Sequence, residues 1–141
     1  MRPGGRYSPP VSTENVEIIR EQYELFNRRE LARAAESWDE DAEWSPARGP
    51  GGLEAASYRG QEAVMRWFEE VAGLWADFEI GHITLRDLPS GVLAVAHLRG
   101  TSSGVEIDAS LAHVWELRDG KIVRVTAYLS EKAALTAVGA D

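Results

Sequence analysis

The 141-residue chain contains no cysteine. Disulfide bonds and thiolate metal sites are therefore excluded, and nothing points to an oxidising compartment. The chain has few histidines, and His82, His97 and His113 form neither an HxH nor an HExxH motif. Because histidine metal sites depend on such spacings, we expect no metal site.

Long apolar runs and clustered positive charge are missing as well. No stretch of about 18 apolar residues could span a bilayer, and residues 1–13 lack the apolar core of a signal peptide. The 15 Lys and Arg are scattered among 23 Asp and Glu, for a net charge of −8. Since nucleic acids require a clustered basic surface, we expect neither nucleic acid nor membrane as a partner, and a cytoplasmic location.

Length and composition predict one folded domain. The chain is 44% hydrophobic and has five tryptophans, which suits a core built around bulky rings. Residues 1–12 are rich in proline and glycine, so we expect a disordered leader there. Residues 13–138 are then the domain.

Apolar residues recur at helical spacing in the first half of the chain. They predict a helix from Ser12 and Thr13 to about Asn27, a short helix over residues 31–38, and a third helix over residues 61–75. An extended segment lies between the last two and ends at Ser45, before a Gly/Pro-rich loop over residues 46–57 that is a candidate lid.

The second half alternates between apolar and polar residues from about residue 78 to residue 129, and a short helix follows. Helices followed by antiparallel strands predict an α+β fold. We expect three N-terminal helices packed on a strongly curved antiparallel sheet that closes into a cone-shaped barrel.

Asp119 and Gly120 form the strongest hairpin signal in the chain, because a two-residue turn favours positive φ at both positions. If Arg118 faces Lys121, antiparallel pairing with a constant index sum sets the register of the whole hairpin.

In that register His113 faces Thr126, and Tyr128 and Trp115 lie on the same face. An imidazole, a hydroxyl and a phenol among apolar residues are typical of a small-molecule pocket. We therefore predict that His113, Thr126, Tyr128 and Trp115 bind a small hydrophobic molecule.

Two interpretations of His113 stay open. Its ordinary pKa of about 6.5 suits proton transfer at neutral pH, so it is a candidate general acid or base. Alternatively, it is a core histidine whose nitrogens bond to Tyr128 or Thr126. Asp108 is an attractive partner but points to the other face of a regular strand. His97 joins His113 only if a three-residue loop connects their strands.

The opposite face of the hairpin is nearly all apolar in this register. Such a face needs a cover, most simply a second copy of the chain, so we expect a homodimer through the outer face of the sheet. The face comprises Ala112, Val114, Val123, Val125, Ala127 and Leu129.

Three segments carry a resemblance to a known family: ENVEIIREQYELFNRRELARAAESWDEDAEW, YRGQEAVMRWFEEV and AHVWELRDGKIVRVTAYLSEKAAL. The chain resembles the SnoaL-like branch of the nuclear transport factor 2 superfamily, which includes ketosteroid isomerase and polyketide cyclases. The resemblance implies the cone fold and a cofactor-independent isomerase, cyclase or lyase, although this fold alone does not choose a reaction.

Functional positions of the family carry over in part. His113, seven residues before the turn glycine, stands where polyketide cyclases have an aspartate. Ser45 stands where the isomerase has its general base, which disfavours steroid isomerisation. The isomerase's oxyanion tyrosine corresponds to Gln22, with Tyr23 beside it. Tyr23 is accordingly expected to contact the ligand. Trp38, Trp44, Trp67 and Trp75 are most simply core residues, and of these Trp44 is expected to line the cavity and contact the ligand.

Two functions are compatible with these residues. The first is a cofactor-independent enzyme in which His113 moves a proton on a small hydrophobic carbonyl or polycyclic compound. The second is a dimeric module that binds a small molecule, or assists a partner, without catalysis.

Overall fold

The computed structural model describes residues 10–45, 58–74, 79–89, 91–102 and 104–139. The helices are α1 (Pro10–Asn27), α2 (Leu31–Ala34), α3 (Gln61–Leu74) and α4 (Glu131–Val138), and a 3-10 turn (Ala35–Ser37) follows α2. The strands are β1 (Trp38–Ser45), β2 (Tyr58–Arg59), β3 (Glu79–Leu88), β4 (Gly91–Ser102), β5 (Val105–Arg118) and β6 (Lys121–Tyr128).

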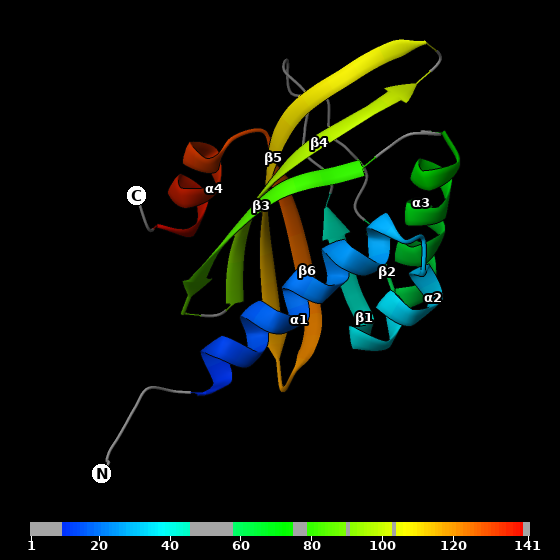
Figure 1. The fold of residues 1–141 in the computed structure, drawn as a ribbon. Helices are drawn as coiled ribbons and strands as arrows, with labels where there is room; N and C mark the ends of the chain where they lie inside the picture. Colours follow the sequence, from blue (N-terminus) through cyan, green and yellow to red (C-terminus); the bar gives the residue numbers. More distant parts are fainter. Residues whose placement is uncertain (1–9, 46–57, 75–78, 90, 103, 140–141) are drawn as a thin grey trace.

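The predicted α+β architecture is confirmed: helices pack on a strongly bent six-stranded sheet (Figure 1). The strand order is β2-β1-β6-β5-β4-β3, and β1 runs parallel to β6. The sheet is therefore mixed and unclosed, whereas an antiparallel sheet closed into a barrel was predicted. The parallel pair arises because β1 and β6 are joined through the rest of the chain rather than through a hairpin.

The boundaries of the first elements differ slightly from those predicted. Helix α1 begins at Pro10, so residues 10–12 belong to a helix and not to the predicted leader. The rest of that leader and the candidate lid at residues 46–57 lie outside the described residues. The short second helix and the strand that ends at Ser45 are confirmed as α2 and β1.

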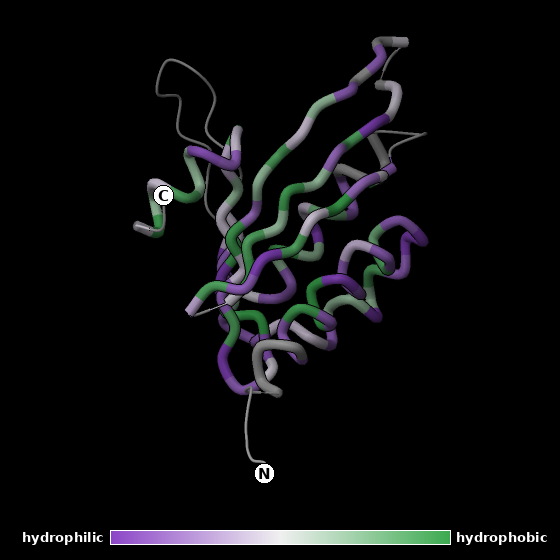
Figure 2. The backbone as a smooth tube through the Cα atoms, turned by 60° about the vertical axis from the view of Figure 1, so that its left-hand side comes forward, coloured by the Kyte–Doolittle hydropathy of each residue, from purple (hydrophilic) through white to green (hydrophobic). Residues whose placement is uncertain are grey.

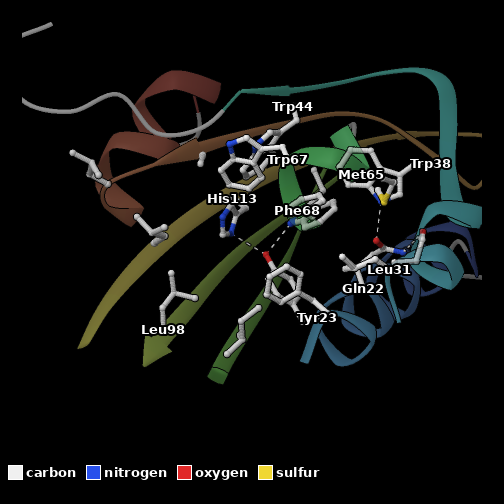
Figure 3. Close-up of a pocket in the computed structure, with 17 residues that line it drawn as sticks. Gln22, Tyr23, Leu31, Trp38, Trp44, Met65, Trp67, Phe68, Leu98 and His113 are labelled. Carbon is white, nitrogen blue, oxygen red and sulfur yellow. Dashed lines mark hydrogen bonds between the residues drawn. The ribbon is translucent and has the colours of Figure 1, made fainter. Parts of the chain in front are cut away.

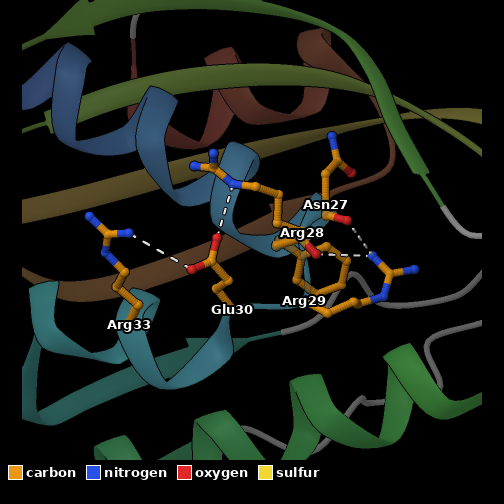
Figure 4. Close-up of polar contacts among 6 residues, drawn as sticks. Asn27, Arg28, Arg29, Glu30 and Arg33 are labelled. Atoms are coloured by element: carbon orange, nitrogen blue, oxygen red, sulfur yellow. Dashed lines mark hydrogen bonds and ion pairs between the residues drawn. The ribbon is translucent and has the colours of Figure 1, made fainter.

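Side-chain bonds connect the C-terminal end of α1 to the sheet. Asn27 donates from Nδ2 to the Ile80 carbonyl at 2.8 Å, and its Oδ1 accepts from the Ile80 amide at 2.8 Å. The next turn is held by ion pairs of Glu30 with Arg28 at 3.1 Å and Arg33 at 3.8 Å (Figure 4). Helix α1 is therefore held across the sheet at a defined place on β3.

The β5–β6 hairpin departs from the predicted register. Arg118 pairs with Lys121 as predicted, but a bulge at Val123 shifts every pair beyond it by one residue. His113 consequently pairs with Ala127 instead of Thr126. Because one residue of slip exchanges the two faces of a strand, the prediction that Thr126 and Tyr128 lie beside His113 is wrong.

The inner face of the sheet packs against the N-terminal helices. Val125 and Ala127, which were predicted to face outward, belong to this core. Apolar and polar stretches alternate along the strands and helices in Figure 2. The largest side chains in the core are aromatic: Tyr23, Trp38, Trp44 and Trp115, with Phe26, Trp67 and Phe68 packed against them.

The outer face of the β5–β6 hairpin is more polar than predicted. Helix α4 covers part of it, where Ala134 packs with Leu93, Ala112 and Val114. Arg124 is exposed on that face in a position where the predicted register had an apolar side chain. The homodimer stays a prediction, but the wide apolar face from which we derived it does not form.

Candidate functional site

A cavity of about 370 Å³ lies between the inner face of the sheet and helices α1 to α3. Its volume is at the lower end of the range for small-molecule sites. The walls are mostly aromatic and aliphatic. They comprise Gln22, Tyr23, Phe26, Leu31, Ala34, Trp38, Trp44, Met65, Trp67, Phe68, Ile80, Leu98, Leu111, His113, Trp115, Ala127 and Leu129.

Tyr23, His113 and Trp115 form a buried hydrogen-bonded series in this cavity. Figure 3 shows the Tyr23 hydroxyl directed toward the His113 ring. The Tyr23 hydroxyl oxygen lies 3.0 Å from Nδ1 of His113 and 2.9 Å from Nε1 of Trp115. Helix α1 supplies the tyrosine, and alternate positions of β5 supply the other two side chains. The three groups meet because α1 crosses the face on which residues 113 and 115 point inward.

The donors in this series can be assigned from their chemistry. An indole nitrogen only donates, so Trp115 donates to the Tyr23 oxygen. The tyrosine proton then has one described acceptor within reach, Nδ1 of His113, which makes Nε2 the protonated nitrogen of the ring. Nε2 makes no hydrogen bond to any described residue. The series of hydrogen bonds from Trp115 through Tyr23 to His113 therefore leaves the Nε2–H of His113 without a described acceptor, on a side chain that lines the cavity.

Burial keeps the His113 imidazole and the Tyr23 hydroxyl uncharged. It lowers the pKa of His113 from 6.5 to about 4, because the imidazolium would lose its hydration. It also raises the pKa of Tyr23 well above 10.0, although the bond from Trp115 opposes that shift. At neutral pH the cavity thus presents an uncharged imidazole and an uncharged phenol.

Aromatic rings form one wall beside His113. Trp44 lies with its ring centroid 5.8 Å from that of His113 and 5.0 Å from that of Trp67. Phe68 completes the group at 5.4 Å from Trp44. Flat apolar ligands pack well against such surfaces.

Gln22 lines the cavity, and both polar atoms of its amide make a hydrogen bond within the protein. Its Oε1 accepts from Nε1 of Trp38 at 2.8 Å, and its Nε2 donates to the Ala34 carbonyl at 3.2 Å. The amide therefore joins α1 to α2 and β1. Tyr23, and not Gln22, is the residue of α1 that reaches His113.

The structure brings together four of the six predicted site residues: His113, Tyr23, Trp44 and Trp115. Thr126 does not line the cavity, and Tyr128 packs near α4 on the outer face. The predicted hydrogen-bond partners of a core His113, Tyr128 or Thr126, are therefore also wrong, because Nδ1 of His113 bonds to Tyr23. The helical spacing of Tyr23 showed that it faces the core, but nothing in the sequence indicated which strand residue it would meet.

The other histidines lie away from the cavity lining. A two-residue loop connects β4 and β5, which puts His97 on the face opposite His113. There it bonds to Asp108, the residue considered as a partner for His113. Within the described segments, no group of three or more His, Asp or Glu could hold a metal ion, and no helix is long and apolar enough to cross a membrane.

Comparisons with known proteins agree with this architecture. A family described as SnoaL-like domain matches residues 19–125. No protein with a curated functional description matches this chain.

Solved structures show the same fold at low sequence identity. A proposed polyketide cyclase from Xanthomonas campestris pv. campestris has 18% identity and a TM-score of 0.73 over 90% of this chain and 98% of that chain. TerC, crystallised with polyporic acid, has 21% identity and a TM-score of 0.71 over 89% and 98%. A phenazine biosynthesis-related protein from Pseudomonas aeruginosa has 18% identity and a TM-score of 0.72 over 94% and 89%.

Proposed function

The chain belongs to the SnoaL-like domain family, and from that membership and the cavity we propose a cofactor-independent enzyme for a small, mostly apolar carbonyl compound. The reaction class is isomerisation, cyclisation or dehydration, in which a proton leaves a carbon next to the carbonyl group. The names of two structural neighbours, a proposed polyketide cyclase and a protein crystallised with polyporic acid, support a small organic ligand.

One observation carries this proposal: the Nε2–H of His113 lacks a described partner, on a side chain that lines an apolar cavity. A carbonyl oxygen of a ligand can accept that bond, and the aromatic wall can contact the rest of the molecule. A donor held in a mostly apolar wall and aimed at an oxygen that gains negative charge is worth more than the same donor in bulk water.

His113 acts in this mechanism as a neutral hydrogen-bond donor. When a proton leaves the carbon next to the carbonyl, negative charge moves to the oxygen, and Nε2–H stabilises it. Tyr23 keeps its own proton because burial raises the pKa of its hydroxyl. Its bond to Nδ1 holds the ring in the tautomer that presents Nε2–H, while the leaving proton passes to water.

Hydrogen exchange in 2-tetralone tests the proposal. In D₂O, the wild-type protein should accelerate exchange of the protons next to the carbonyl at least tenfold over buffer, as followed by NMR. His113→Phe removes the donor and should abolish the acceleration. His97→Phe is the matched control because His97 lies on the other face. Unchanged exchange in His113→Phe would remove His113 from the mechanism.

A second function is a binding module without catalysis. It is favoured by one observation, that no carboxylate lines the described part of the cavity, so no strong general base is at hand. This function predicts a retained ligand in native mass spectrometry and no exchange of 2-tetralone above the buffer rate.

A further inference from the structure

Trp115 bonds to the same hydroxyl group as His113. The three indoles that are buried among the described residues differ in their acceptors: Gln22 for Trp38, Tyr23 for Trp115, and no described residue for Trp44. Of these indoles, Trp115 is therefore the one that can influence His113 through a shared partner.

The indole of Trp115 is held in place by its neighbours. Val92 on β4 and Val125 on β6 pair with Trp115 on either side, and both are fully buried. The rings of Tyr23 and Trp115 pack in a T shape, with centroids 5.6 Å apart and planes inclined by 74°. Because an indole nitrogen donates and never accepts, the bond of 2.9 Å to Tyr23 has one possible direction.

The bond between Tyr23 and His113 can in principle run in two directions. In the first arrangement, the hydroxyl donates to Nδ1 and the ring carries its proton on Nε2. In the second, the ring carries its proton on Nδ1 and donates it to the hydroxyl oxygen. The hydroxyl proton then has no described acceptor, and Nε2 becomes an acceptor instead of a donor.

The indole N–H of Trp115 favours the first arrangement. With this N–H bonded to the Tyr23 oxygen, the first arrangement satisfies both the oxygen and the proton of the hydroxyl, whereas the second leaves the proton unpaired. Without the indole N–H, the first arrangement leaves the oxygen unpaired and the second leaves the proton unpaired. Since an unpaired buried polar atom is unfavourable in either case, removal of the indole N–H should weaken the preference between the two arrangements.

We propose that Trp115 is a positioning residue: its indole N–H holds the bond between Tyr23 and His113 in one direction and keeps the imidazole in the tautomer that donates from Nε2. This inference rests on the proposed function, in which Nε2–H bonds to a carbonyl oxygen. The other tautomer would offer an acceptor and favour the hydrogen of a hydroxyl group over a carbonyl oxygen. Trp115 therefore also sets the class of ligand.

¹⁵N NMR of the ligand-free protein at pH 7 measures this tautomer directly. In the wild type, the Nε2–H form should exceed the Nδ1–H form by roughly tenfold or more, because the second arrangement leaves a buried donor unpaired. In Trp115→Phe, which keeps a ring but removes the donor, the two forms should differ by less than roughly threefold. Benzothienylalanine at position 115 has a sulfur atom in place of the indole N–H at nearly the same volume. It should give the same result, and it supplies the measurement if Trp115→Phe does not fold.

Trp38→Phe is the matched control. Trp38 is also buried, and its ring centroid lies 5.8 Å from that of Trp115, but it donates its hydrogen bond to Gln22. The control variant therefore loses a buried indole donor from the same core without touching Tyr23. Its His113 ring should keep the wild-type tautomer.

Hydrogen exchange in 2-tetralone connects the tautomer to the proposed function. Because the Nε2–H form alone donates to the carbonyl oxygen, the accelerated exchange should slow in Trp115→Phe by the factor by which this form is depleted. From the tautomer ratios above, that factor is roughly two- to threefold.

The outcomes separate this inference from the proposed function. If a folded Trp115 variant keeps the wild-type tautomer, or if Trp38→Phe changes it equally, the role of Trp115 is overturned and the Nε2–H donor of His113 stands. If the tautomer shifts in Trp115→Phe but the wild type does not accelerate exchange, or the exchange does not follow the tautomer, the proposed function falls and the effect of Trp115 on the ring stands. A wild-type ring protonated at Nδ1 would overturn both.

Discussion

The hydroxyl of Tyr23 lies 3.0 Å from Nδ1 of His113, which is 90 positions away in the chain. This bond joins helix α1 to the middle of strand β5 inside an apolar cavity. It leaves Nε2 as the imidazole nitrogen that makes no hydrogen bond to a described residue.

Replacement of Tyr23 by Phe should destabilise the protein by about 2–4 kcal/mol, because the buried indole of Trp115 and Nδ1 of His113 both lose their partner. Urea unfolding at pH 7 measures the change. Tyr128→Phe is the control, since the Tyr128 hydroxyl bonds to no described residue. This substitution should change the free energy of unfolding by less than about 0.5 kcal/mol. Equal effects of the two substitutions would contradict the assigned network.

The same substitution should also change the tautomer of His113. In the wild type, ¹⁵N NMR should show a neutral ring protonated at Nε2. Without the Tyr23 proton, Nδ1 has no donor and the ring should populate both tautomers. A wild-type ring protonated at Nδ1 would contradict the assigned direction of these hydrogen bonds.

Stability should fall as the pH is lowered from 6.5 toward 4. The folded protein has a His113 pKa of about 4, against 6.5 without burial, so the unfolded chain binds more protons in this window. His113 makes its full contribution to the free energy of unfolding above pH 6.5. At pH 4 the loss of this contribution approaches about 3 kcal/mol. Urea unfolding of the wild type and of His113→Gln across this range isolates the contribution of His113, because the carboxylates affect the stability of both proteins equally. Parallel pH profiles would show that His113 is not buried as described.

Gly91 should tolerate no side chain. A Cβ built there would lie 1.8 Å from the Trp115 carbonyl oxygen, so Gly91→Ala must separate β4 from β5. We expect a loss of about 3 kcal/mol or more, seen as a lower Tm. Gly81→Ala is the matched control, since its nearest atom outside the chain neighbours is 3.8 Å away. Its Tm should stay close to that of the wild type.

Deletion of Val123 should be tolerated. Val123 is the extra residue of the bulge, so its removal leaves Ile122 and Val125 facing inward and Arg124 facing outward. Deletion of Thr126 is the control, because any pairing then turns either Arg124 inward or Ala127 outward. Circular dichroism and thermal unfolding should show a folded protein for the first deletion and a strongly destabilised one for the second. The opposite order would place the bulge elsewhere.

Local signals in the chain were sufficient for the elements of the fold. Helical spacing identified α1 and α3, and Asp119 with Gly120 identified the β5–β6 turn and the pairing of Arg118 with Lys121. These features depend on residues close in sequence, whose backbone preferences act within a few positions. The aromatic character of the cavity followed as well, because large rings with few polar neighbours have to be buried.

Which side chains line the cavity depended on long-range packing. One bulge at Val123 moved Thr126 and Tyr128 to the outer face, and no local signal marks it, since Val123 and Val125 suit either face of a strand. The meeting of Tyr23 with His113, and the isolation of the Trp44 indole, depend on how α1 lies across the sheet. A chain specifies its turns through neighbouring residues, but which side chains share a cavity is settled only when distant elements pack together.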